Sequence, residues 1–272
     1  MAEDNNLGKL FELLSRAEKE KDITVRDDQG DFAAFLDTAK RCRAKGGRFR
    51  LIDTGTFSVF ELEWLAEAGA DIYTSNEARP NTAEIGLLTR ACSRGDAIAA
   101  YFHQGPLTRN AESDSTSLLF LLGIGQSGAH VYLTNRDMER SSSDLAELAH
   151  ACRSAGTRLV YYHHGRLAAG LEGLGRNGAW IHLSDSSLEF AEDTRLFFDV
   201  IEEASAAGAG LVLHVEKGLE PTLLRDIMRA GAFVLFATLP AGRDSSLRPL
   251  EQRARRRTLD FRAHYLYPTF MP

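Results

Sequence analysis

The sequence has few cysteines, few prolines and no long apolar segment. Its three cysteines, Cys42, Cys92 and Cys152, form no Cys-x-x-Cys pair, which is typical of a reducing compartment and predicts a cytoplasmic location. Only seven of the 272 residues are proline, and 44% are apolar, which excludes a low-complexity chain. Apolar runs such as 118–122 fall far short of the roughly 20 residues that cross a bilayer. The start, MAEDNNLGKL, lacks a secretory signal, so we expect a soluble protein with no membrane partner.

The chain has no excess of positive charge, since its 38 Asp and Glu outnumber its 32 Lys and Arg. The formal net charge is −6, which excludes binding to nucleic acid through global charge. The one dense basic segment is Arg253–Arg257, and a solvated outer helix commonly carries such charges. We therefore expect no nucleic-acid partner.

An internal repeat organises the chain. Eight times, a glycine ends a helix-like stretch and a short apolar run rich in β-formers follows it. The glycines are Gly47, Gly69, Gly95, Gly128, Gly156, Gly178, Gly208 and Gly231. Glycine takes the left-handed conformation that ends a helix, after which the chain can enter a buried strand. The repeat therefore predicts eight strand–helix units.

The eight apolar runs are typical of parallel strands covered by helices. They read RLID, DIYTS, AIAAYF, HVYLT, RLVYY, WIHLS, LVLHV and FVLFA, continuous stretches more than alternating ones. Amphipathic segments such as VFELEWLAEA lie between them. Eight such units predict an α/β protein with a closed (β/α)8 TIM-type barrel. An open doubly wound sheet is the alternative, but its Gly-x-Gly-x-x-Gly is absent after the first strand.

The division of the chain follows from the repeat. Residues 1–45 precede the first predicted strand and contain two helix-like segments, 7–21 and 32–45, so we expect an N-terminal helical extension there. Residues 46–272 then form the barrel. No linker rich in proline, glycine or serine interrupts it, which predicts a single domain.

Histidines and carboxylates lie at the carboxyl ends of the predicted strands, where barrels of this class carry their active sites. Imidazole and carboxylate are suitable ligands for zinc or manganese, and such a metal makes bound water a nucleophile near neutral pH. The sequence thus predicts a metal-dependent hydrolase whose ligands converge at one mouth. The expected metal ligands are His103, His163, His214, Asp185 and Glu216, of which Asp185 and Glu216 are also expected to be catalytic.

Strand geometry favours some of these residues over others. His214 and Glu216 are two apart, so both can face the same side of a strand. Of the adjacent His163 and His164, only one can face inward.

Two other functions remain open. Amidohydrolase-type metal barrels carry a His-x-His after their first strand, whereas this chain has LIDTG there. A polar rim occurs in every barrel, so the chain can equally be a non-catalytic barrel that binds a small molecule or another protein. A third possibility is a Schiff-base lyase or aldolase acting through Lys217, the only lysine after Lys45. We expect a small-molecule ligand, and the sequence does not indicate an oligomeric state.

Overall fold

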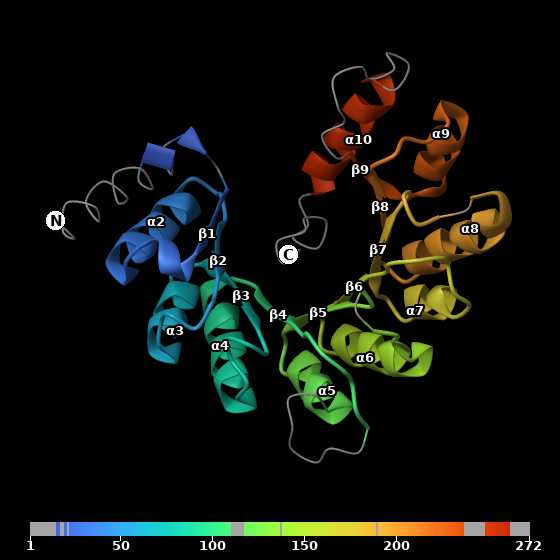
Figure 1. The fold of residues 1–272 in the computed structure, drawn as a ribbon. Helices are drawn as coiled ribbons and strands as arrows, with labels where there is room; N and C mark the ends of the chain where they lie inside the picture. Colours follow the sequence, from blue (N-terminus) through green and yellow to red (C-terminus); the bar gives the residue numbers. More distant parts are fainter. Residues whose placement is uncertain are drawn as a thin grey trace. The chain divides into compact units, whose positions relative to one another are not determined.

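The computed structural model is an α/β structure in which parallel strands alternate with helices (Figure 1). It describes residues 15–16, 19–20, 22–109, 117–136, 138–188, 190–236 and 248–261. Within these residues nine strands follow one another in the sheet in sequence order, from β1 to β9. The α/β class and the sequential order are therefore confirmed.

The strands have the following bounds: β1 (Ile23–Arg26), β2 (Phe49–Ile52), β3 (Ala70–Ser75), β4 (Ala99–Phe102), β5 (His130–Thr134), β6 (Leu159–Tyr162), β7 (Trp180–Ser184), β8 (Leu211–Val215) and β9 (Phe233–Phe236). The helices are α2 (Phe32–Ala44), α3 (Val59–Glu67), α4 (Thr82–Gly95), α5 (Leu118–Gln126), α6 (Ser142–Ser154), α7 (Leu171–Arg176), α8 (Phe190–Ala206), α9 (Pro221–Ala230) and α10 (Arg248–Phe261). A 3-10 turn, η1 (Asp27–Gln29), follows β1.

All eight predicted strands are present, and one more precedes them. β1 lies inside the predicted N-terminal extension and pairs in parallel with β2, where Ile23 is the partner of Phe49. The second predicted helix of the extension is α2, whereas residues 7–14, 17, 18 and 21 of the first lie outside the described residues. In the described part of the chain, no helix is long and apolar enough to cross a membrane.

The chain divides after Val131 into two compact units. Unit 1 runs up to Val131 and contains β1 to β4, and unit 2 comprises Tyr132–Thr269 and contains β6 to β9. Each unit has parallel strand pairs and a buried apolar core of its own. In unit 1 the rings of Phe35 and Phe49 lie 5.9 Å apart between α2 and β2.

The helix-ending glycines behave as the repeat predicts at most junctions. Gly231, for example, ends α9 with φ +115° and leads into β9. Gly95 differs, because the left-handed residue after α4 is Asp96, with φ +54°. A Cβ on Gly95 would lie 1.9 Å from the carbonyl oxygen of Ala66. Gly95 is therefore required for the close approach of α4 to α3 rather than for the turn.

Candidate functional site

A row of four rings crosses one face of the sheet in unit 2. Tyr162 and His182 are register partners on β6 and β7, and Ser184, two residues after His182, is the partner of His214 on β8. Because side chains two apart on a strand share a face, these rings all point to one side. Centroid distances are 6.5 Å from Tyr132 to Tyr162, 4.3 Å from Tyr162 to His182 and 5.2 Å from His182 to His214. We call these four residues the ring row.

The two histidines of the ring row form a hydrogen-bonded pair. The Nδ1 atom of His182 lies 2.9 Å from the Nε2 atom of His214. A neutral imidazole has one N–H donor and one acceptor nitrogen. In this contact one of the two nitrogens therefore carries a proton and donates it, and the other carries none and accepts. His182 is 1% exposed, whereas His214 is partly exposed near the end of β8. The pair thus has one buried and one accessible member.

Burial keeps His214 uncharged near neutral pH. It lowers the pKa of His214 because the charged ring loses hydration. The carboxylate of Glu216 acts in the opposite direction, and His164 lowers the pKa of His214 further. A neutral His214 is in the state that a general base requires.

The second ring nitrogen of His214 is open. Its Nε2 atom is engaged with His182, and its Nδ1 atom has no hydrogen bond with any residue in the described ranges. An imidazole fixed through one nitrogen and open at the other is the arrangement in which a partner orients a catalytic base.

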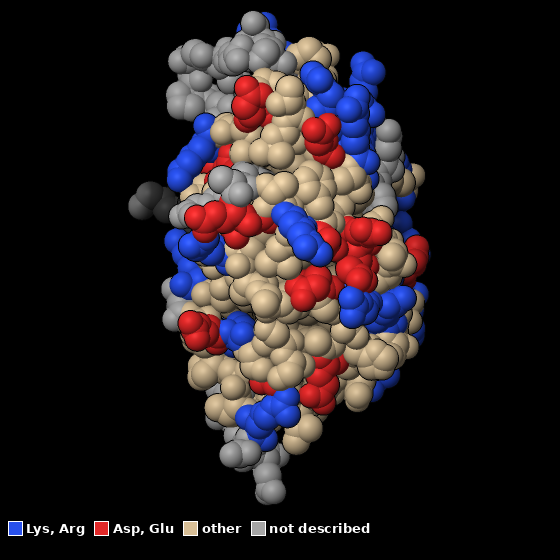
Figure 2. All heavy atoms as spheres, turned by 90° about the vertical axis from the view of Figure 1, so that its right-hand side faces the viewer, with Lys and Arg blue, Asp and Glu red and all other residues tan. Residues whose placement is uncertain are grey.

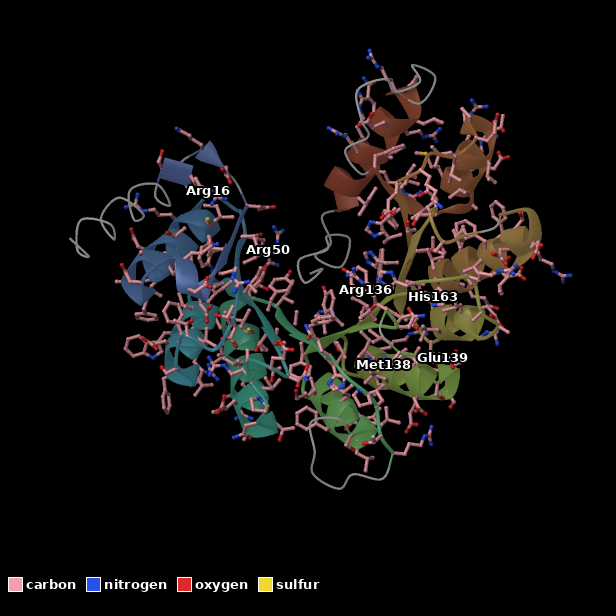
Figure 3. All side chains as sticks on the ribbon, in the orientation of Figure 1. Arg16, Arg50, Arg136, Met138, Glu139 and His163 are labelled. Carbon is pink, nitrogen blue, oxygen red and sulfur yellow. The ribbon has the colours of Figure 1, made fainter. Side chains whose placement is uncertain are left out.

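His163 lies on the other face of the sheet from the ring row. It follows Tyr162 directly, and its ring lies 5.9 Å from that of Tyr161. Its Nε2 atom is 2.7 Å from the carbonyl oxygen of Arg166, and its Nδ1 atom is 3.4 Å from Nδ2 of Asn135. The carbonyl can only accept, so Nε2 donates to it and His163 fixes the loop that follows β6. Figure 3 labels His163 together with Arg136 of the segment after β5.

The hydrogen-bonding capacity of Asp185 is largely taken up by the backbone after β8. Its carboxylate accepts hydrogen bonds from the N–H groups of Glu216 (2.7 Å), Lys217 (3.2 Å) and Gly218 (3.0 Å). Asp185 is also 6% exposed. These bonds hold the loop after β8 in place and leave the carboxylate little capacity for a metal or substrate.

Similar hydrogen bonds recur at other strand ends in both units. Asn135 accepts from the N–H of His164 and donates to its carbonyl oxygen, and Asn76 does the same with Gln104. Asp27 accepts from the N–H groups of Thr54 and Thr56. We call Asp27, Asn76, Asn135 and Asp185 the strand-end clamps. They account for much of the polar rim that the sequence displays.

His103 belongs to unit 1 and repeats the arrangement of His163. It is fully buried, and its Nε2 atom lies 3.2 Å from the carbonyl oxygen of Pro106, three residues later. Residues 101–107 (YFHQGPL) and 161–167 (YYHHGRL) are similar in sequence, and in each unit the histidine binds a carbonyl oxygen three residues later.

Glu216 and Lys217 follow β8 and are exposed. Glu216 is close enough to His214 to raise its pKa. The Nζ atom of Lys217 donates to the carbonyl oxygen of Ser186 at 2.8 Å. Schiff-base chemistry relies on a desolvated amine, and exposed Lys217 does not provide one.

The expected metal ligands are therefore divided among different environments. Glu216 acts on His214 through its charge, whereas His163 and Asp185 are held in backbone hydrogen bonds. Among the described residues, no group of three or more His, Cys, Asp or Glu is arranged to hold a metal ion.

Sequence reasoning missed His182 and Tyr162. His182 is a polar residue within the apolar run WIHLS, which was the available signal. Its pairing with His214 depends on the register of β7 and β8, which the sequence does not specify.

Comparisons with known proteins give no family for the chain: no protein-family model matches it, and no curated protein does. Among solved structures, it is similar to a candidate mandelate racemase/muconate lactonizing enzyme from Sorangium cellulosum (18% identity, 72% of this chain and 46% of that one, TM-score 0.38). It thus spans less than half of that protein's length. It is also similar to an HpcH/HpaI aldolase/citrate lyase family protein from Burkholderia cenocepacia (13% identity, 79% and 94%, TM-score 0.33). A further match is the spore coat polysaccharide biosynthesis protein spsE from Bacillus subtilis (13% identity, 90% and 71%, TM-score 0.33).

Proposed function

We propose that the chain is a hydrolase for a small molecule, in which His214 is the general base at the carboxyl end of β8. The observation that supports this most is the hydrogen bond between His182 and His214, together with the open Nδ1 atom of His214. Burying a polar ring such as that of His182 in a sheet costs free energy unless it is hydrogen-bonded. Its hydrogen bond to the accessible His214 is therefore consistent with a functional role for His214.

The proposed reaction has two proton transfers. His214 Nδ1 removes a proton from a water molecule, whose oxygen attacks the electrophilic carbon or phosphorus atom of the substrate. The bond to the leaving group then breaks, and the proton returns from Nδ1 to that group. Glu216 stabilises the imidazolium that exists between the two transfers, since its carboxylate favours the charged ring. His182 is a positioning residue that holds the ring of His214.

A metal-assisted form of the hydrolysis is the second candidate. The favourable charge interaction between Glu216 and His214 supports it, because imidazole and carboxylate are ligands of zinc and manganese. Further ligands would have to come from outside this pair, since the described residues offer no third one in place. The metal content of protein purified without chelator separates the two forms.

The experiment is a hydrolysis assay with p-nitrophenyl acetate and p-nitrophenyl phosphate as probes. We expect His214→Gln to reduce the rate on the hydrolysed probe about 100-fold or more, in the range that general-base catalysis contributes. The control is His150→Gln, which removes an exposed histidine of α6 and should leave the rate unchanged.

The pH–rate profile distinguishes catalysis from folding. The wild-type profile should rise through the lowered pKa of His214, and that rise should be missing in His214→Gln while its circular dichroism spectrum is retained. Equal rates in both variants would remove His214 from the reaction. Hydrolysis of neither probe by the wild type would favour a binding barrel.

A further inference from the structure

A basic cavity lies in unit 2, away from the ring row. It has a volume of about 680 Å³ and lies at the turns that lead into β8 and β9, so it is at the amino-terminal edge of these strands. Its lining includes Ser205 from the end of α8, Gly208 and Gly231 from those turns, and Arg253, Arg256 and Arg257 from α10. The ring-row histidines lie toward the carboxyl ends of β7 and β8, so the cavity and the ring row lie at opposite ends of the strands.

One arginine forms a fixed wall of this cavity. The guanidinium of Arg257 donates to the carbonyl oxygens of Met228, Gly231 and Ala232, which end α9. It also lies over the ring of Phe233, 4.4 Å from the centroid. These contacts hold a positive charge at the cavity without neutralising it.

The other two arginines have no counter-charge. Arg253 and Arg256 are exposed, and neither pairs with an acid anywhere in the described ranges. The neighbouring Arg255, by contrast, pairs with Glu251 at 3.0 Å. Burial lowers the pKa of Arg257, and repulsion from Arg253 lowers it further. Three like charges around one cavity destabilise the protein unless an anion joins them.

Acidic side chains neutralise basic ones elsewhere on this part of the molecule. Arg176 of α7 pairs with Glu203 of α8, for example, at 2.6 Å. Figure 2 shows basic and acidic side chains interspersed over most of the face drawn, with basic ones gathered near its upper edge, at the height of α9 and α10 in Figure 1. The unpaired arginines of the cavity differ from this pattern.

We propose that this cavity binds the oligophosphate group of a small molecule. Arginine presents several N–H donors in a planar fork that matches phosphate oxygens, and two such forks are available on Arg253 and Arg256. Ser205 adds a hydroxyl donor at the end of α8. The volume lies within the range of small-molecule sites and exceeds what a single phosphate fills. The proposal does not depend on the hydrolase reaction, since it uses other residues at another edge of the sheet.

The test is calorimetric titration of the full chain with sodium tripolyphosphate at constant ionic strength. We expect saturable binding by the wild type and a dissociation constant at least tenfold higher for the double variant Arg253→Gln/Arg256→Gln. The matched control is Arg195→Gln/Arg229→Gln, which removes the same charge from exposed sites on α8 and α9. It should bind within about twofold of the wild type, because a surface charge outside the cavity acts only through a screened field.

Three outcomes would overturn the proposal. One is the absence of saturable binding, and another is an equal loss of affinity in both double variants, which would indicate a general charge effect. The third is tighter binding of a single-stranded 12-nucleotide DNA than of tripolyphosphate, which would assign the arginines to nucleic acid. The thermal midpoint of the cavity variant should equal or exceed that of the wild type, because the variant removes repulsion, so loss of binding cannot be attributed to unfolding.

Discussion

Replacing Asp185 by alanine should lower the free energy of unfolding by about 3–5 kcal/mol, because three N–H groups lose a charged acceptor at once. The carboxylate binds the backbone of Glu216, Lys217 and Gly218, and the side chain is almost completely buried. A hydrogen bond to a charged group contributes about 1.5–3 kcal/mol, and the three are not fully additive. Urea unfolding followed by circular dichroism measures the loss.

Two variants at neighbouring positions separate the clamp from a general effect of charge. Asp185→Asn keeps one oxygen acceptor and the side-chain shape, so it should cost about half as much as Asp185→Ala. Glu216→Gln changes an exposed carboxylate and should alter stability by less than about 0.5 kcal/mol. A loss below about 1 kcal/mol in Asp185→Ala would show that these three bonds contribute little, and would return Asp185 to the list of residues available for catalysis.

Replacing Arg79 by methionine should destabilise unit 1 by about 3–5 kcal/mol, because it leaves a buried carboxylate without its counter-charge. Arg79 binds Asp53 through two bonds, Nε to Oδ2 at 2.9 Å and Nη2 to Oδ1 at 3.0 Å. The side chain of Asp53 is 0% exposed and that of Arg79 is 10% exposed. Water therefore cannot replace the guanidinium when it is removed.

A second variant checks that the buried charge is the cause. The double variant Asp53→Asn/Arg79→Met removes the charge. Its amide oxygen can still accept from the N–H of Gly55, and its amide nitrogen can donate to the hydroxyl of Thr74, two groups that donate to different oxygens of Asp53 in the wild type. It should be more stable than Arg79→Met alone in the same urea experiment. If the double variant is instead less stable than the single one, the loss comes from packing of the Arg79 side chain and not from the unpaired carboxylate.

Much of the fold could be predicted because its signals are local. A glycine that ends a helix and an apolar run that enters a sheet lie next to each other in the sequence, and each of the eight predicted runs contains a strand. β1 was missed because Ile23–Arg26 is short and alternates buried with exposed residues, unlike the continuous runs of the other strands.

Less of the site could be predicted, because it depends on two facts that the sequence does not display. The first is which face a residue takes at the end of a strand: His163 turns away from the ring row, whereas His214 joins it. The second is competition from the backbone. The carboxylate of Asp185 is chemically suited to bind a metal, but backbone N–H groups after β8 already donate hydrogen bonds to it. His214 and Glu216 were predicted as neighbours from their two-residue spacing, and Glu216 does act on the pKa of His214.

His182 and His214 form a hydrogen-bonded pair in which His214 is uncharged and open for proton transfer. Nitrogen-15 NMR of histidine-labelled protein, recorded as a function of pH, tests it directly. The groups that face His214 are His182 of β7, His164 after β6 and Glu216 after β8. We expect His214 to titrate below its ordinary value of 6.5, and Glu216→Gln to lower its pKa further because a favourable negative charge is lost. A His214 that titrates at or above 6.5, with chemical shifts unaffected by His182→Phe, would show that it is not the uncharged member of such a pair.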